Sequence, residues 1–252
     1  MMKQILLITD GGSNVGDSPV VAAAQAYAEG ITVNVAGIID EGTIGEYGAA
    51  EIAEIARAGG GISRIVSSAQ LSRTVQMMTR QTIAGSIKQA VNQELRQLFG
   101  VEGVSALPPT KRSEVVKVME EMEETVSLSV ALLIDASASM KPKLRAVEEA
   151  IRDLTLSLQA REGRSEVAVF HYPGSSQDEY CVLDSEWTDS PSKIGKLFGQ
   201  IRMRGTTPTG PALMQVIAYI GETCGKIRSE PLDARHEPAR SVSNEVRSDY
   251  VV

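Results

Sequence analysis

Hydrophobic positions in the first part of the chain fall into two alternating patterns. Short apolar runs at 5–9, 31–39 and 62–66 predict strands inside a sheet. The segments 19–28 and 46–58 between them are Ala-rich or carry apolar residues three or four positions apart, which is typical of helices. Strands that alternate with helices in this way predict parallel strands joined by helical crossovers.

The same alternation returns after residue 125. Strands are expected at 126–134, 166–172 and 180–187, and a helix at 144–158. A further helix is expected to open at Pro191, and a last helix is expected to end near residue 220.

A long helical stretch separates these two parts. Apolar residues recur every three or four positions from Leu71 to Leu98, which predicts one helix with a single apolar stripe. The segment 107–109, Leu-Pro-Pro, interrupts this pattern. Thr110 is then expected to cap a second, strongly charged helix that runs to about Glu124.

Together the patterns predict an α/β fold with a Rossmann-like, doubly wound, mostly parallel sheet and an inserted helical pair. We expect two β-rich halves at 1–80 and 126–221, and a helical connector at 81–125. The segment 222–252 is polar, charged and aperiodic, so we expect it to be a disordered tail.

Charge and composition exclude several classes of protein. The chain of 252 residues has 25 Lys and Arg against 32 Asp and Glu, a formal net charge of −7, which argues against a nucleic-acid partner. Cys181 and Cys224 are too few for a disulfide framework, so we expect buried or incidental thiols. His171 and His236 are too few for an ordinary zinc site. The early apolar run 5–8 is too short for a signal peptide or a membrane span. We therefore expect a cytoplasmic protein with no membrane partner.

Three loops carry oxygen-rich side chains at corresponding places in the predicted layers. Asp135, Ser137 and Ser139 follow one strand, Asp10 follows another, and Thr207 precedes a helix. Ligands of open α/β sheets bind beyond the carboxyl ends of the strands, so these loops are expected to converge. An all-oxygen set of this kind suits Mg²⁺ or Mn²⁺. Because most of the ligands are neutral hydroxyls, the ion would keep positive charge and accept a carboxylate from a partner.

The segments that carry these residues are LLIDASASM at 132–140, GTTPTGPAL at 205–213 and LLITDG at 6–11. Together they resemble the metal-ion-dependent adhesion site of von Willebrand factor type A (VWA) domains. The resemblance implies a VWA fold in which Asp135, Ser137, Ser139 and Thr207 are in or near direct contact with Mg²⁺, and Asp10 reaches it through water. It also implies a non-enzymatic module that captures an Asp or Glu side chain of a protein partner. Bacterial intracellular VWA proteins act as adaptors or assembly factors, including beside AAA ATPases.

The three segments are out of order relative to an ordinary VWA domain, where LLITDG would come last. The resemblance therefore implies a circular permutation: residues 126–221 resemble the amino-terminal half of the family's domain and residues 1–80 its carboxy-terminal half. A domain-swapped homodimer is the alternative to one chain that folds on itself. Thr206 stands where the family commonly has Gly, which leaves open whether Thr206 or Thr207 faces the ion. The Thr-Gly-x-Ala-Leu sequence that follows favours Thr207.

Two other functions remain as alternatives at this point. One is a Mg²⁺-dependent phosphoryl-transfer or hydrolytic enzyme that uses Asp135, although such enzymes need a second carboxylate where this chain has Ser137. The other is a vestigial site on a protein whose helical pair at 81–125 is a self-associating surface. A phosphate-binding loop at 205–210 is not supported, because Pro211 and Ala212 stand where Lys and Ser or Thr are required.

Overall fold

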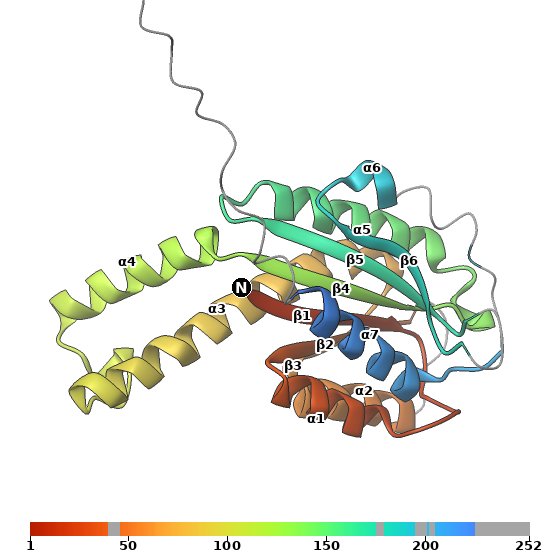
Figure 1. Ribbon diagram of the computed structural model, residues 1–252, viewed down its shortest axis with the longest axis horizontal. Helices are drawn as coiled ribbons and strands as arrows, with labels where there is room; N and C mark the ends of the chain where they lie inside the picture. The colour runs from red at the N-terminus through yellow and green to blue at the C-terminus, as the bar shows by residue number, and fades with distance from the viewer. Residues whose placement is uncertain (40–45, 175–178, 195–200, 202–204, 225–252) are drawn as a thin grey trace, which may run out of the picture.

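The computed structural model describes residues 1–39, 46–174, 179–194, 201 and 205–224. Within these residues, six strands form a sheet in the order β3-β2-β1-β4-β5-β6 (Figure 1). Neighbouring strands from β3 to β5 are parallel, and β6 is antiparallel to β5. The predicted mostly parallel α/β sheet is confirmed. The strands are β1 (Met2–Thr9), β2 (Ile31–Ile38), β3 (Gly60–Val66), β4 (Leu128–Asp135), β5 (Ser165–Tyr172) and β6 (Val182–Thr188).

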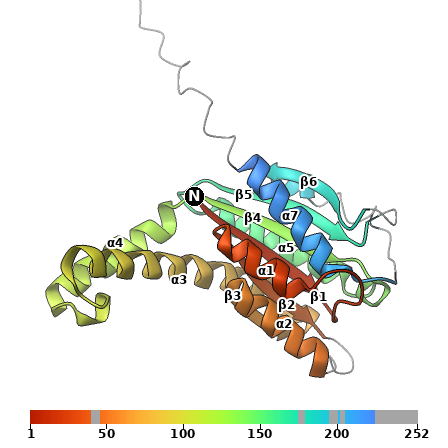
Figure 2. The ribbon, with the colours of Figure 1, turned by 60° about the horizontal axis from the view of Figure 1, so that its bottom comes forward.

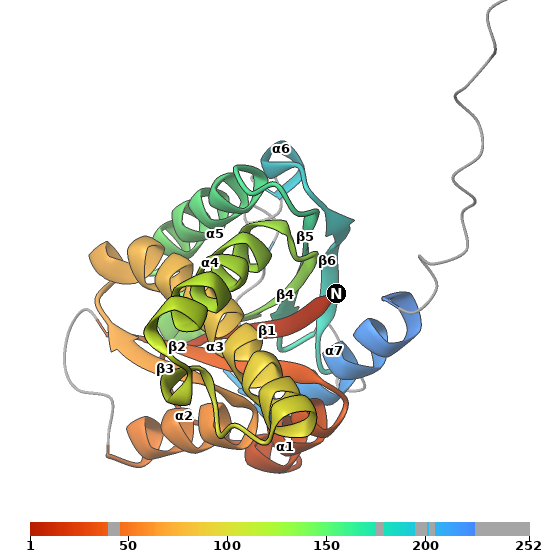
Figure 3. The ribbon, with the colours of Figure 1, turned by 90° about the vertical axis from the view of Figure 1, so that its left-hand side faces the viewer.

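Helices cover both faces of the sheet, as a doubly wound fold requires (Figures 2 and 3). One face carries α1 (Pro19–Ala28), α2 (Glu46–Ala58) and α7 (Thr209–Thr223). The other carries the first part of α3 (Leu71–Phe99), together with α5 (Leu144–Gln159) and the short α6 (Pro191–Ile194). The last helix, α4 (Pro109–Thr125), packs along α3.

Burial on both faces explains why the central strands are apolar at nearly every position. In β1, Ile5 and Leu7 pack under α1 and α7, and Leu6 and Ile8 pack under α3 and α5. All four side chains are 0% exposed. Complete burial of one such side chain contributes about 1.5–3 kcal/mol, so the paired central strands supply much of the stability of the fold.

The strand order places a topological switch point between β1 and β4. From β1 the chain winds outward through β2 to β3, and from β4 it winds outward in the other direction through β5 to β6. β1 and β4 pair in parallel, with Ile8 beside Ile134. The connections that leave their carboxyl ends therefore run to opposite faces of the sheet, and α/β sheets of this order bind ligands beyond such a point.

The predicted long helix is confirmed, but its apolar stripe is not buried along its whole length. Leu71, Val75 and Ile87 are buried against the sheet, whereas Leu98 is 69% exposed and Phe99 is 71% exposed. The 29 residues of α3 extend about 43 Å, and the distal part projects with α4 from the end of the sheet where β1 begins (Figure 1). The expected boundary between the first half of the fold and the helical connector, at residues 80 and 81, therefore falls inside this continuous helix.

One predicted helix cap is wrong, although the helix itself is present. Helix α4 begins at Pro109, and its N-cap residue is Pro108 rather than Thr110. Ser18 is the N-cap residue of α1, but its side chain makes no capping hydrogen bond. In both helices a proline occupies the first turn, and its fixed φ and missing N–H favour a helix start without a side-chain cap.

The end of the chain extends the last helix slightly further than expected. Helix α7 runs to Thr223, so residues 222 and 223 are helical rather than part of the predicted tail. Residues 225–252 of that tail lie outside the described residues. Among the described helices, none has the length and apolar character needed to cross a membrane.

Candidate metal-binding site

Asp135 is the last residue of β4 and is 0% exposed. Its Oδ2 accepts a hydrogen bond from the Thr9 hydroxyl at 2.7 Å, and its Oδ1 accepts one from the Ser137 backbone N–H at 2.8 Å. Thr9 is the last residue of β1. The parallel pairing of β1 with β4 therefore brings a hydroxyl from one strand end to the carboxylate on the other.

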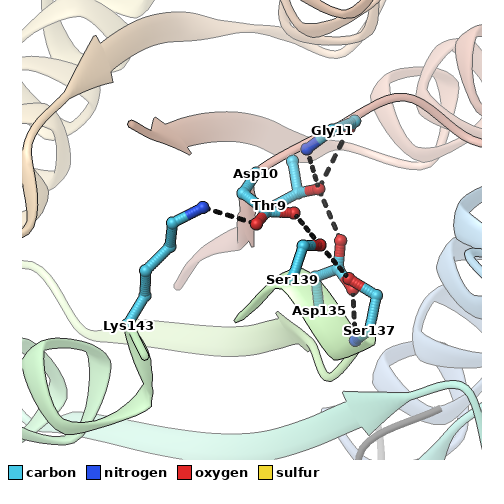
Figure 4. Close-up of polar contacts among 7 residues, drawn as sticks. All are labelled: Thr9, Asp10, Gly11, Asp135, Ser137, Ser139 and Lys143. Carbon is cyan, nitrogen blue, oxygen red and sulfur yellow. Dashed lines mark hydrogen bonds and ion pairs between the residues drawn. The ribbon is translucent and has the colours of Figure 1, made fainter. Parts of the chain in front are cut away.

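Hydrogen-bonded oxygens link the turn after β4 to the loop after β1 (Figure 4). The hydroxyls of Ser137 and Ser139 lie 3.1 Å apart, and the Ser139 hydroxyl donates to Oδ1 of Asp10 at 2.9 Å. Asp10, Asp135, Ser137 and Ser139 thus lie in one connected cluster. Four of the five predicted ligand residues meet at the carboxyl ends of two neighbouring strands.

Lys143 completes this cluster on the side of Asp10. Its Nζ lies 2.5 Å from Oδ2 of Asp10, and the two side chains are 14% and 5% exposed. Asp10 is therefore shared between the Ser139 hydroxyl on one oxygen and the Lys143 ammonium on the other (Figure 4).

Thr207 lies in the loop that precedes α7 and is 7% exposed, whereas Thr206 is exposed. Its backbone N–H donates to Oδ1 of Asn14 at 2.8 Å, and its carbonyl oxygen accepts from the Ser13 hydroxyl at 3.1 Å. The Asn14 backbone N–H donates to the same carbonyl oxygen at 3.2 Å. The loop of Thr207 is therefore fixed to the loop that carries Asp10. The Thr207 hydroxyl makes no hydrogen bond to the other four predicted ligand residues, all of which the structure describes.

Close backbone packing holds these two loops together. A Cβ built on Gly210 would lie 1.9 Å from the carbonyl oxygen of Asp17, so glycine is required at that contact. Gly16 has a φ of +83°, and a Cβ there would lie 2.4 Å from Pro211 Cγ. Glu51 of α2 accepts a hydrogen bond from the Ser13 backbone N–H at 2.6 Å. The first turn of α7 and the loop after β1 are thus packed closely against each other.

The electrostatics of the cluster fit a bound cation. Burial raises the pKa of the Asp135 carboxyl above its ordinary value, and the nearby Asp10 carboxylate raises it further, whereas hydrogen bonds from Thr9 and Ser137 lower it. The donors that reach Asp135 are neutral, so its charge has no direct cationic partner among the described residues. A cation placed between the two carboxylates would relieve this unfavourable arrangement.

The donor chemistry limits which cation fits. The side-chain atoms that converge are carboxylate and hydroxyl oxygens, the ligands preferred by Mg²⁺ and similar hard cations. In the described part of the chain, no group of three or more His, Cys, Asp and Glu side chains could hold a metal. A metal bound at this place would therefore depend on the serine and threonine hydroxyls.

Sequence reasoning missed Thr9 and Lys143. Thr9 precedes a predicted ligand residue directly, but its role depends on which strand lies beside β1. Lys143 follows Ser139 by four residues, and this short separation in the sequence was the available signal for it.

The cysteines match the prediction of buried thiols. Cys181 and Cys224 are free and buried, and burial raises the pKa of Cys181 to about 12. His171 in β5 is 8% exposed, and its Nδ1 lies 2.7 Å from Oδ2 of Asp184 on the neighbouring strand. This contact links β5 to β6.

Comparison with known proteins supplies a family. The sequence matches no protein-family model. It is 46% identical over 216 residues to the uncharacterized protein YabS of Bacillus subtilis (strain 168), and the match covers 85% of this chain and 87% of YabS. The chain belongs to the YabS family.

A solved structure extends the YabS-family likeness to three dimensions. An uncharacterized protein from Alicyclobacillus acidocaldarius subsp. acidocaldarius DSM 446 is 41% identical, with a TM-score of 0.83 over 90% of this chain and 96% of that chain. A structure of proximal thread matrix protein 1 from the mussel byssus, with a zinc-occupied MIDAS motif, is 15% identical and superposes with a TM-score of 0.26. That TM-score is too low to relate the mussel protein to the YabS family.

Proposed function

We propose that this chain is a circularly permuted VWA domain, a non-enzymatic module that binds Mg²⁺ and captures an Asp or Glu side chain of a protein partner. The main support is the convergence of Asp10, Asp135, Ser137 and Ser139 at the switch point between β1 and β4. In this proposal Asp135, Ser137, Ser139 and Thr207 hold the ion, and Asp10 acts through water. Mn²⁺ is the second candidate for the same oxygen ligands.

The chemistry of the proposed ligands explains how a partner would be captured. When bound, the ion would be held directly by one carboxylate, that of Asp135, and otherwise by neutral hydroxyls, so it would keep positive charge. The residues of this chain would hold that charge at the edge of the sheet where β1 and β4 end. Ser139 is exposed, whereas Ser137 and Asp135 lie beneath it. An acidic side chain from a partner would approach from the side of Ser139.

Burial of Asp135 favours a ligand over a catalytic nucleophile. Asp135 is 0% exposed, and both of its carboxylate oxygens accept hydrogen bonds. A nucleophile in phosphoryl transfer needs an oxygen that can reach the phosphorus atom in line with the leaving group. We expect no Mg²⁺-dependent turnover of p-nitrophenyl phosphate. Turnover that is lost in Asp135→Asn would instead support the enzyme alternative.

The metal-binding step is tested by calorimetric titration with Mg²⁺ and Mn²⁺. We expect the wild-type protein to bind, and Ser137→Ala/Ser139→Ala to lose binding. The matched control is Ser190→Ala/Ser192→Ala, because these hydroxyls form a similar pair, 2.9 Å apart, beyond the end of β6. Binding that survives in Ser137→Ala/Ser139→Ala, or no binding by the wild type, would overturn the proposal.

Partner capture is tested with the same variants in a pull-down from a bacterial lysate. A protein retained with Mg²⁺, released by EDTA and absent from Ser137→Ala/Ser139→Ala would be identified by mass spectrometry. Replacement of its acidic residues by Asn or Gln should then abolish binding. An AAA ATPase or another intracellular complex is the class of partner that the VWA resemblance implies, and a cytoplasmic location is part of the same proposal.

Sedimentation of the purified chain tests the proposed self-contained fold against a domain-swapped dimer. We expect a monomer, because β1 pairs with β4 within one chain in the described structure. Leu98 and Phe99 are exposed at the end of α3, so they test the alternative in which the helical pair at 81–125 self-associates. A dimer that Leu98→Ser/Phe99→Ser converts to a monomer would favour that alternative.

A further inference from the structure

Lys143 makes a contact that the proposed ligand set does not explain. Its ammonium lies 2.5 Å from Oδ2 of Asp10, and both side chains are largely buried, at 14% and 5% exposure. The other oxygen of Asp10 accepts the Ser139 hydroxyl at 2.9 Å. The Lys143 ammonium therefore occupies one of the two oxygens of Asp10, a residue that we assign to the metal site (Figure 4).

The local backbone fixes Lys143 in this position. It is the residue directly before α5, and its backbone N–H donates to the carbonyl oxygen of Met140 at 2.9 Å. Its own carbonyl oxygen accepts the Val147 N–H at 3.1 Å. The start of α5 thus anchors the base of the side chain on the same turn that carries Ser139.

Helix stability does not account for a lysine at this place. The amino-terminal end of a helix carries partial positive charge, so a cation beside it is unfavourable. The first turn of α5 contains no acidic residue that would offset this charge. The favourable interaction that Lys143 does make is the ion pair with Asp10, which belongs to the proposed site rather than to the helix.

We propose that Lys143 is the internal counter-ion of this site, so that a divalent cation must compete with its ammonium for Asp10. The inference rests on the proposed function, because it assigns a role to Lys143 only if the cluster binds metal. In the metal-free protein, Lys143 neutralises Asp10 and keeps its carboxylate in place. Asp10 would reach the ion through water, and turning its carboxylate towards that water would cost the Lys143–Asp10 pair, which lowers the affinity for metal.

The test compares Lys143→Met with the wild type in Mg²⁺ and Mn²⁺ titrations. Methionine keeps a long unbranched chain and removes the charge. We expect the dissociation constant for Mg²⁺ to fall about tenfold, the size expected when one charge-assisted hydrogen bond no longer has to be broken. Lys143→Arg should stay close to the wild type. The matched control is Lys141→Met, an exposed residue on the same turn that is not bonded to Asp10.

A double-mutant cycle separates competition for Asp10 from general charge repulsion. If Lys143 acts through Asp10, Lys143→Met should have little effect on metal affinity in an Asp10→Asn background. A full tenfold effect in that background would overturn the inference. Thermal unfolding without metal supplies a second readout: Lys143→Met should lower the midpoint more than Lys141→Met, and Mg²⁺ should raise the Lys143→Met midpoint more than that of the wild type.

The outcomes distinguish this inference from the proposed function. If neither the wild type nor Lys143→Met binds Mg²⁺ or Mn²⁺, the metal site itself is refuted, and the inference falls with it. If both bind with the same affinity, the proposed function stands and the role of Lys143 is wrong. A lower dissociation constant in Lys143→Met alone, lost on the Asp10→Asn background, supports both.

Discussion

The hydrogen bond from Thr9 to Asp135 leads to a quantitative prediction about stability. Replacement of Thr9 by valine keeps the branched shape of the side chain and removes the hydroxyl that donates to Oδ2 of Asp135 at 2.7 Å and accepts the weaker bond from the Gly11 backbone N–H at 3.3 Å. Thr9 is 2% exposed and Asp135 is 0% exposed, so water cannot readily replace the lost donor. A hydrogen bond to a charged group contributes about 1.5–3 kcal/mol. We expect Thr9→Val to lower the free energy of unfolding of the metal-free protein by that amount.

The measurement is urea unfolding at pH 7, followed by circular dichroism, with EDTA present. Thr155→Val is the matched control, because Thr155 is 1% exposed and its hydroxyl donates only to the Ile151 carbonyl within α5, at 2.8 Å. That bond is neutral, so its loss should lower the unfolding free energy by less than about 1 kcal/mol. A Thr9→Val effect no larger than that of Thr155→Val would refute the claim that Thr9 supports a buried carboxylate.

Three further predictions concern the scaffold. Because the pKa of Cys181 is raised to about 12, its thiol should react slowly with DTNB at pH 8 in the folded protein. The measurement uses Cys224→Ser, and reaction at the rate of the unfolded chain would contradict the prediction. The same raised pKa should make the fold less stable as pH rises from about 9 towards 12, because only the unfolded thiol ionises readily in that range; pH-dependent urea unfolding would measure this. Arg161→Met removes the guanidinium that donates to two carbonyl oxygens at the end of α4, and should increase amide exchange across α4; unchanged exchange would refute this anchoring role. Gly210→Ala places a Cβ against the Asp17 carbonyl oxygen and should lower the free energy of unfolding by about 1–3 kcal/mol. Gly221→Ala is the control, because nothing lies within 4 Å of its added Cβ, and it should be neutral or stabilising. Equal melting temperatures for the two variants would show that the Gly210 contact does not require glycine.

Most of the elements followed from local pattern. The apolar runs of β1, β2 and β4 reflect burial on both faces, which leaves a continuous apolar segment. The helical spacing of α5 reflects burial on one face, which leaves a period of three to four residues. The start of α1 at Pro19 also followed from local chemistry. The capping role given to Thr110 was wrong, because a hydroxyl near a helix start does not by itself establish a cap.

The convergence of the proposed ligand residues was predicted in part for the same reason. Asp135, Ser137 and Ser139 form one turn, so their proximity is local and could be inferred from spacing. Their meeting with Asp10, 129 residues away from Ser139, needed the expectation that β1 and β4 end at the same edge of a sheet. The resemblance to VWA domains supported that expectation before any strand order was known.

Strand pairing, by contrast, is a property of the folded chain alone. Only the register of β1 against β4 puts the Thr9 hydroxyl on Asp135, and only the path of the turn before α5 puts the Lys143 ammonium on Asp10. The sequence by itself determined which segments form strands and helices and which residues offer oxygen ligands, because both depend on local periodicity and residue type. The tertiary structure decided which charges neighbour one another, because that depends on contacts between segments far apart in the chain.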